Sequence, residues 1–166
     1  MSLLPDYSFN SVTEIPVSFF KEKGIKGIAI DVDNTLTGDG SQYLHEEIRE
    51  WVEQVKKAGL KLCAVSNNDR ERLQPFAETI GIPYIFEAKK PSPRCIKKVL
   101  GILGTDKSET AMIGDQYFTD MLFAYRVRLT SILINPLGDD NHSGATVKRF
   151  FEKPIRRMIR RKKENE

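Results

Sequence analysis

The chain has 166 residues and a mass of 18.9 kDa, with 40% hydrophobic and 30% charged residues, a mean hydropathy of -0.39 and a formal net charge of +3. This length suits a single domain, and the composition excludes a disordered, collagen-like or coiled-coil chain. No apolar run is as long as the about 18 residues that a membrane-spanning helix needs. The first residues also lack the pattern of a signal peptide, so we expect a cytoplasmic protein.

The first predicted element is a buried strand at Ile25 to Asp31, where a short β-branched run ends abruptly in carboxylates. We assign residues 1–24 to an N-terminal extension. From His45 to Ala58 apolar residues recur at a spacing of three and four, which predicts an amphipathic helix that ends at Gly59. A second buried strand follows at Leu60 to Ser66.

The alternation of helices and strands continues along the chain. In order, we expect a helix at 70–80, a strand at 84–86, a helix at 94–103, a strand at 110–115, a helix near 119–125 and a strand at 129–135. Five strands that alternate with helices predict an α/β fold with a doubly wound, parallel, five-stranded Rossmann-like sheet.

Polar side chains directly follow four of these strands, at the edge where parallel α/β sheets bind their ligands. They are Asp31, Asp33, Asn34 and Thr35; Ser66, Asn67 and Asn68; Lys89 and Lys90; and Asp115, Thr119 and Asp120. A ligand that consists of a phosphoryl group and Mg²⁺ would use all of these kinds of side chain. The carboxylates suit the ion, because Mg²⁺ binds carboxylate, water and phosphate oxygens. Asp31 and Asp115, together with a backbone carbonyl, would complete such a site.

A carboxylate at this edge can also attack phosphorus, and the aspartyl phosphate that forms divides hydrolysis into two easier steps. This chemistry needs a second acid, and Asp33 lies two residues after Asp31. Asp33 would protonate the leaving oxygen and later take a proton from water. Lys90 and Ser66 would neutralise and hydrogen-bond the phosphoryl oxygens.

Four motifs at these positions resemble, in order, those of the haloacid dehalogenase (HAD) superfamily of phosphatases. They are DVDNTLT (31–37), SNN (66–68), KP (90–91) and GDQYFTD (114–120). The resemblance implies a HAD-like phosphatase with the following site residues. Asp31 is the nucleophile and Asp33 the acid/base; Ser66, Asn67 and Lys90 bind phosphate; Asp31, Asp33, Asp115 and Asp120 hold Mg²⁺.

The forms DNTL, SNN, KKP and GDQxxTD, with the FEKPIRR-type tail, are similar to the YqeG-like group of HAD subfamily IIIA, which includes phosphatidylglycerophosphate phosphatases. Lys89 and Lys90 both remain candidates for the phosphate-binding lysine, and we favour Lys90 because it precedes the proline. HAD phosphatases often carry a cap domain after the first or second motif. Neither gap has room for one here, so we expect no cap and an open site.

The C-terminal segment is strongly basic, with nine Lys or Arg and three Glu between 148 and 166. Its apolar residues recur at helical spacing, so we predict a domain at 25–146 followed by a basic amphipathic segment at 147–166. Such segments bind anionic membrane surfaces, which places the protein peripherally on the inner face of the membrane. As an alternative, the segment packs on the domain and does not bind a membrane. Pro154 would interrupt a single continuous helix in this segment.

We expect a Mg²⁺-dependent phosphatase that acts on phosphatidylglycerophosphate at the membrane surface. Two alternatives stay open: the same chemistry on a soluble sugar or nucleotide phosphate, and a non-catalytic module that binds phosphate or magnesium. Nucleic acid is not the expected partner, because aromatic stacking platforms are missing from the sequence pattern. Cys63 and Cys95 lie far apart without a CxxC spacing, so neither a disulfide framework nor a zinc site is expected.

Overall fold

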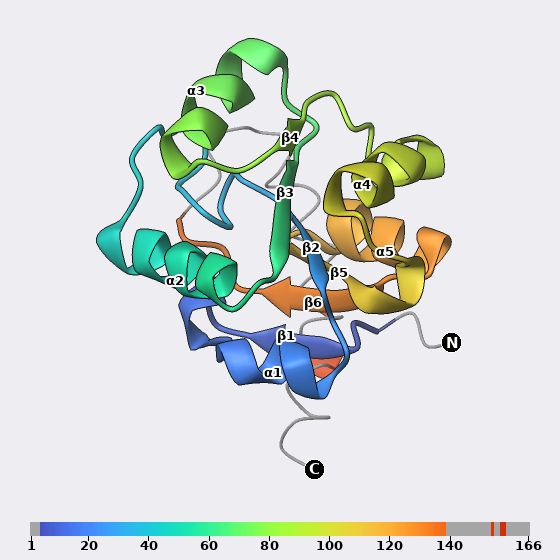
Figure 1. Cartoon of the computed structure of the whole chain (residues 1–166). Coiled ribbons are helices and arrows are strands. Elements are labelled where there is room, and N and C mark those ends of the chain that lie inside the picture. Colours follow the sequence, from blue (N-terminus) through green and yellow to red (C-terminus); the bar gives the residue numbers. More distant parts are fainter. Residues whose placement is uncertain (1–3, 139–153, 155–156, 159–166) are drawn as a thin grey trace.

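A computed structural model describes residues 4–138, 154 and 157–158, and the predicted basic segment at 147–166 lies almost entirely outside them. One parallel sheet has the strand order β1-β6-β5-β2-β3-β4 (Figure 1). Its strands are β1 (Tyr7–Phe9), β2 (Gly27–Ile30), β3 (Lys61–Val65), β4 (Tyr84–Ile85), β5 (Thr110–Gly114) and β6 (Thr130–Ile134). The helices are α1 (Val17–Glu22), α2 (Glu46–Lys57), α3 (Arg70–Ile80), α4 (Ile96–Leu103) and α5 (Leu122–Val127).

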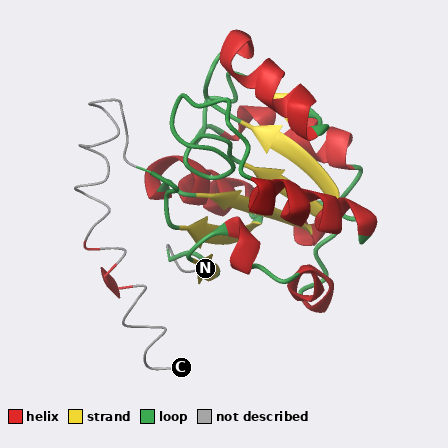
Figure 2. Ribbon diagram, turned by 90° about the vertical axis from the view of Figure 1, so that its left-hand side faces the viewer, coloured by secondary structure: helices red, strands yellow, loops and turns green. Residues whose placement is uncertain are grey.

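Helices cover both faces of the sheet, which confirms the predicted doubly wound α/β architecture (Figures 1 and 2). Alternate side chains of β2 separate two apolar cores, as the two-residue period of a strand requires. Ile28 and Ile30 pack with residues of α1, α2 and α3 on one face, whereas Ala29 packs with residues of α4 and α5 on the other. Because both faces are covered, the central strand β2 is apolar throughout its length.

The sheet has six strands rather than the predicted five, because the N-terminal segment adds β1 alongside β6. Three half-buried residues at a sheet edge are too short to show a strand period in the sequence. The same segment forms α1, whose fully buried Phe20 lies 6.3 Å from Trp51, ring centre to ring centre. The Trp51 indole N–H also donates to the carbonyl of Ile15 at 3.0 Å. Residues 7–22 are therefore part of the main core.

Within residues 4–138 the chain forms no cap domain. A turn, a loop and α2 connect β2 to β3, and α3 alone fills the connection from β3 to β4. None of the helices described is long and apolar enough to cross a membrane. Among the described residues, no inserted domain covers the carboxyl ends of the strands.

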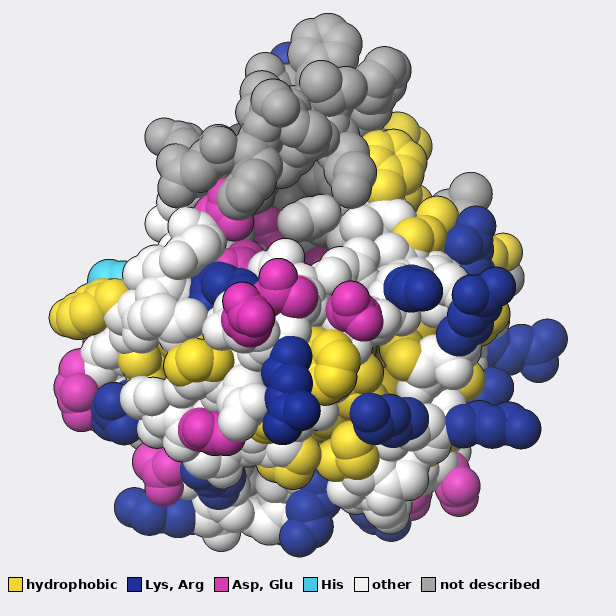
Figure 3. All heavy atoms as spheres, turned by 90° about the horizontal axis from the view of Figure 1, so that it is seen from above, with side chains coloured by type: hydrophobic (Ala, Val, Ile, Leu, Met, Phe, Trp, Pro, Cys, Tyr) yellow, Lys and Arg dark blue, Asp and Glu magenta, His cyan; other side chains and the backbone are white. Residues whose placement is uncertain are grey.

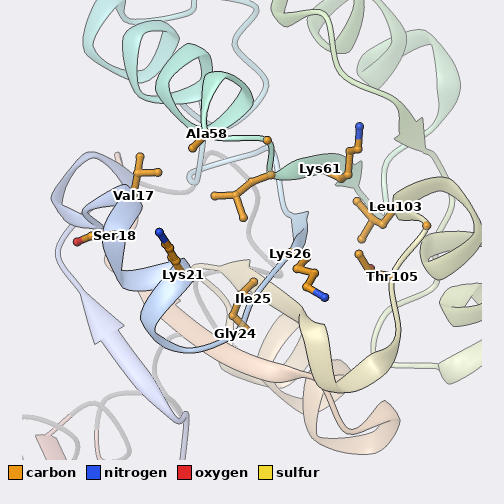
Figure 4. Close-up of a pocket in the computed structure, with 13 residues that line it drawn as sticks. Val17, Ser18, Lys21, Gly24, Ile25, Lys26, Ala58, Lys61, Leu103 and Thr105 are labelled. Atoms are coloured by element: carbon orange, nitrogen blue, oxygen red, sulfur yellow. The ribbon is translucent and has the colours of Figure 1, made fainter.

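A cavity of about 600 Å³ lies at the opposite end of the sheet, where β2 and β3 begin (Figure 4). Apolar side chains from Val17, Ile25, Leu60 and Leu103 line it, and Lys21, Lys26 and Lys61 surround it. Its lining residues precede the strands, so the cavity is separate from the polar side chains that follow them.

Candidate active site

The candidate site forms where the chain changes direction in the sheet, between β2 and β5. From β2 the chain moves outward to β3 and β4, and then returns to place β5 on the other side of β2. Ile30 is in register with Ile113, and the Asp31 N–H donates to the Ile113 carbonyl at 2.9 Å. Asp31 and Asp115 therefore leave neighbouring strands at the switch point, where open α/β sheets bind ligands.

Four charged side chains are buried together at this point. The Lys90 Nζ lies 2.7 Å from Asp31 Oδ1 and 2.6 Å from Asp120 Oδ1. Carboxylate oxygens of Asp31, Asp115 and Asp120 all lie within 4.8 Å of one another. Asp31 is 7% exposed and Lys90 is 5% exposed, and both other carboxylates are still more buried. The fold thus brings residues that follow three separate strands, β2, β4 and β5, into one charged cluster.

Among the described residues the cluster places one ammonium beside three carboxylates. Burial raises the pKa of Asp31 to about 7, although the neighbouring Lys90 ammonium opposes this shift. For Lys90, burial by itself lowers the pKa, but the carboxylates of Asp120 and Asp31 outweigh burial and hold the pKa above its ordinary value. A divalent cation would add positive charge beside these carboxylates.

The donor set fits a hard cation such as Mg²⁺, which prefers oxygen ligands and binds through one or two carboxylates. Asp31, Asp115 and Asp120 offer carboxylate oxygens at one place, and no His or Cys side chain of the described residues belongs to this cluster. The buried charge and the oxygen ligands therefore point to the same kind of ion. These three residues are the ones that would hold it.

Asp120 is positioned by a π-helical turn, Tyr117–Met121, that follows β5. Such turns are rare and often occur at functional sites. The Gln116 backbone N–H donates to Asp120 Oδ2 at 3.1 Å, while Asp120 Oδ1 accepts from Lys90. The side chain also packs against Gly114, where an added Cβ would lie 2.6 Å from the Asp120 Cβ. A glycine at this position is what allows the Asp120 carboxylate to reach the cluster.

The Asp33 carboxylate lies outside the buried cluster, although the sequence resemblance placed it among the metal ligands. Its Oδ1 accepts from Arg72 Nη2 at 2.5 Å and from the Gly40 backbone N–H at 3.0 Å, and its Oδ2 accepts from Asn68 Nδ2. Arg72 Nη2 also donates to the Ser41 carbonyl at 2.7 Å. Three donors therefore fix Asp33 in one orientation, two residues beyond Asp31.

The residues after β3 have different surroundings. Ser66 is buried, and its hydroxyl accepts from the Asn68 backbone N–H at 3.1 Å. Asn67, which the resemblance assigns to phosphate, holds the Lys90 backbone: its Nδ2 donates to the Lys90 carbonyl at 2.8 Å, and its Oδ1 accepts from the Lys90 N–H at 2.6 Å. Of the two candidate lysines, Lys90 lies in the cluster and Lys89 is exposed.

Comparison with known proteins connects this geometry to a family. The family described as mitochondrial PGP phosphatase matches residues 1–136. The Bacillus subtilis protein called "Probable phosphatase YqeG" is 32% identical over 159 residues, which cover 96% of this chain and 92% of that protein. The chain belongs to the PGP phosphatase family. It is therefore a member of a family of phosphatases, the activity that the motifs predicted.

Further relatives agree with this family. An Arabidopsis thaliana protein named phosphatidylglycerophosphate phosphatase 1, chloroplastic/mitochondrial, is 28% identical over 144 residues, which cover 81% of this chain but 41% of that longer protein. A Legionella pneumophila hydrolase assigned to HAD subfamily III A has a solved structure with a TM-score of 0.53 and 21% identity, covering 71% of this chain and 69% of that one. The latter likeness shows the shared fold.

Sequence reasoning about this PGP phosphatase family member missed Arg72 and the roles of Asn67 and Gly114. Arg72 lies in a predicted helix with several charged neighbours, so nothing in the spacing separates it from the exposed Arg70. Gly114 belongs to the GDQYFTD motif, but its contact with Asp120 depends on the π-helical turn. The sequence contains one signal for this contact: Gly114 directly precedes the motif aspartate Asp115, and a glycine there leaves room for another side chain to come close.

Replacing Gly114 by Ala should lower the free energy of unfolding by about 1–3 kcal/mol, as is usual for overpacking at a closely packed position. The added methyl overlaps the Asp120 side chain, so Asp120 must move away from Lys90. Urea denaturation measures the change. As a control, Gly101→Ala on α4 meets nothing within 4 Å and should stabilise by about 0.5–1 kcal/mol. An unchanged urea midpoint for Gly114→Ala would contradict the packing argument.

Proposed function

We propose that this phosphatase removes the terminal phosphate of phosphatidylglycerophosphate at a membrane surface, through an aspartyl phosphate on Asp31 and with Mg²⁺ as cofactor. The observation that carries the proposal is the buried cluster of Asp31, Lys90, Asp115 and Asp120 in a member of the PGP phosphatase family. In this family, a carboxylate poised beside a buried ammonium fits the nucleophile of a phosphoryl transfer.

In the first step, an Asp31 carboxylate oxygen attacks phosphorus and the bond to the leaving alcohol breaks. The Asp33 carboxyl gives its proton to the leaving oxygen, so a neutral alcohol departs. In the second step, Asp33 takes a proton from a water molecule, whose oxygen attacks the same phosphorus. The bond to Asp31 breaks, inorganic phosphate leaves, and both carboxyl groups return to their starting states.

The other site residues would bind the phosphoryl oxygens. Lys90 supplies a fixed positive charge beside Asp31, and Asn67 holds the Lys90 backbone so that this charge stays in place. Ser66, buried at the end of the neighbouring strand, would donate its hydroxyl. Bound Mg²⁺, held by Asp31, Asp115 and Asp120, would neutralise phosphate charge and fix the phosphorus relative to Asp31.

Two observations support a lipid substrate beyond the family's description. The described residues form no cap domain over the site, so further exclusion of water would come from the substrate's own surroundings. The chain also leaves the described domain beside the site, since the Leu137 N–H donates to the Asn34 carbonyl at 3.0 Å. Membrane binding by the basic segment at 147–166 is part of the proposal.

Phosphate release from vesicles that contain phosphatidylglycerophosphate tests the substrate and the nucleophile together. Wild-type protein with Mg²⁺ should release phosphate, and Asp31→Asn should release none above the blank, because the nucleophile is lost while side-chain volume is kept. Circular dichroism checks that the variant is folded. Turnover by folded Asp31→Asn would overturn the covalent mechanism. Turnover of sugar or nucleotide phosphates alone would assign the chemistry to a soluble substrate.

Magnesium should stabilise the folded protein, because it binds the native cluster and relieves repulsion among buried carboxylates. At 100 times its Kd a ligand contributes about 2.7 kcal/mol, so Tm should rise by about 5–10 °C. Asp115→Asn should lose most of this shift, whereas Glu50→Gln, an exposed acid on α2, should keep it. An equal Tm in Mg²⁺ and in chelator would show that the cluster does not bind magnesium.

Arg72→Met should lower kcat mainly for substrates with poor leaving groups, because these need a well-placed proton from Asp33. We expect a loss of about 100-fold with an alkyl phosphate and a much smaller loss with p-nitrophenyl phosphate. Arg70→Met is the matched control, since Arg70 lies on the same helix but contacts Gln74. Equal losses on both substrates would mean that Arg72 has only a structural role.

A further inference from the structure

A group of exposed cations lies beside the candidate site and has no place in the proposed chemistry. Residues 88–105 contain five Lys or Arg and no Asp or Glu. All of these cations except Lys90 are exposed. We define the α4 basic surface as Lys89, Arg94, Lys97, Lys98 and the exposed Arg126 of α5. Arg126 Nη1 donates to the Pro91 carbonyl at 3.1 Å, so α5 and the Lys90 loop form one surface.

This surface belongs to the same face of the molecule as the site. Lys89 directly precedes the buried Lys90, and Arg94 lies in the 3₁₀ turn that leads from this loop into α4. Figure 3 views the molecule from the side on which β3 ends, and Lys and Arg side chains gather along its right-hand edge, above α4 and α5. A phosphate group that approaches the cluster therefore passes beside these cations.

The cations of α4 are not neutralised by acidic neighbours. Lys97 and Lys98 lie in the first turn of α4, and Arg94 lies in the 3₁₀ turn directly before it. No carboxylate among residues 4–138 lies within ion-pair distance of any cation of this surface. Lys98 Nζ lies 5.9 Å from the centre of the Phe86 ring instead. The positive charge of this surface is therefore available to a partner.

The position of these cations also costs local stability. Lys97 and Lys98 lie in the first turn of α4, which contains no acidic residue. The N-terminus of a helix carries partial positive charge and favours Asp or Glu there. α2 shows the favourable arrangement, with Glu46 and Glu47 in its first turn and Lys56 and Lys57 in its last. The unfavourable arrangement in α4 points to a role for its cations outside the fold.

We propose that the α4 basic surface binds the anionic headgroups of a lipid bilayer and so turns the open site toward the membrane. The inference rests on the proposed function, because a lipid substrate is what makes this orientation useful. A cluster of cations spread over one exposed face matches a negatively charged leaflet. The same contact would position Lys90 and Asp31 near the terminal phosphates of lipids in that leaflet.

Exposed apolar side chains on other loops of this face fit the same partner. Tyr43 is 65% exposed in the loop after β2, where its ring packs edge-on against His45. Leu137 is 38% exposed after β6, next to the Asn34 loop. Tyrosine is a preferred residue at membrane interfaces, because its ring is apolar and its hydroxyl polar. A bilayer can contact cations and apolar side chains together, which favours it over RNA as the occupant.

The test compares two full-length variants with the same change in net charge. One carries Arg94→Gln, Lys97→Gln and Lys98→Gln on the α4 basic surface. The control carries Lys21→Gln, Lys57→Gln and Lys61→Gln, three exposed lysines near the opposite end of the sheet. Co-sedimentation is measured with phosphatidylcholine vesicles that contain or lack phosphatidylglycerol. Activity is measured on p-nitrophenyl phosphate and on phosphatidylglycerophosphate in the same vesicles.

The α4 variant should bind anionic vesicles on the order of 100-fold more weakly than wild type, and the control should stay within a few-fold. Both should keep wild-type activity on p-nitrophenyl phosphate, because neither set touches the cluster. Equal loss in the two variants, or no loss in either, would overturn the proposal. So would loss of RNA binding by the α4 variant with vesicle binding unchanged.

The same data separate this inference from the proposed function. If wild type hydrolyses phosphatidylglycerophosphate but the α4 variant binds and acts on vesicles normally, the substrate assignment stands and the docking surface is wrong. If vesicle binding depends on the α4 basic surface but no phosphatidylglycerophosphate is hydrolysed, the docking surface stands and the substrate assignment is wrong.

Discussion

The rest of the site depends on the double ion pair that Lys90 makes with Asp31 and Asp120 in the protein interior. Buried charges are tolerated only when partners and hydrogen bonds replace the water that they lose. Several features of the fold meet this requirement. The Asn67 amide fixes the Lys90 backbone from both sides, and Gly114 leaves room for Asp120. The functional residues and the residues that support them are thus one electrostatic unit.

Much of this arrangement was predictable, because it follows from rules that act over short distances in sequence. Apolar strands that end in polar residues predicted a parallel sheet with Asp31, Ser66, Lys90 and Asp115 at one edge, and the sheet has that form. What escaped prediction depends on contacts between distant segments. Arg72 reaches Asp33 across 39 positions, and no local pattern distinguishes it from Arg70. β1 is too short for its period to be visible.

Some differences between sequence and structure concern how a motif residue acts. Asn67 and Asp33 were both assigned to ligands, since Asn and Asp side chains commonly bind phosphate and metals. In the structure, Asn67 holds the Lys90 backbone and Asp33 is oriented by Arg72, Asn68 and Gly40. A position in a motif indicates that a residue belongs to the site. The conformation of the loop decides where the side chain of a motif residue points. Asn34, in the loop after β2, has a φ of 59°, which asparagine adopts more readily than most residues.

The two kinds of charge on this face have opposite consequences for a phosphorylated lipid. Cations outside the site attract an anion over a Debye length of about 8 Å at physiological salt. The buried cluster places three carboxylates around one ammonium, so by itself it disfavours a phosphate dianion at close range. Attraction therefore brings the headgroup to the entrance, and entry of the phosphate depends on a cation that reverses the charge of the cluster. Binding of phosphate and binding of magnesium at Asp31, Asp115 and Asp120 should accordingly be coupled, with each raising the affinity for the other.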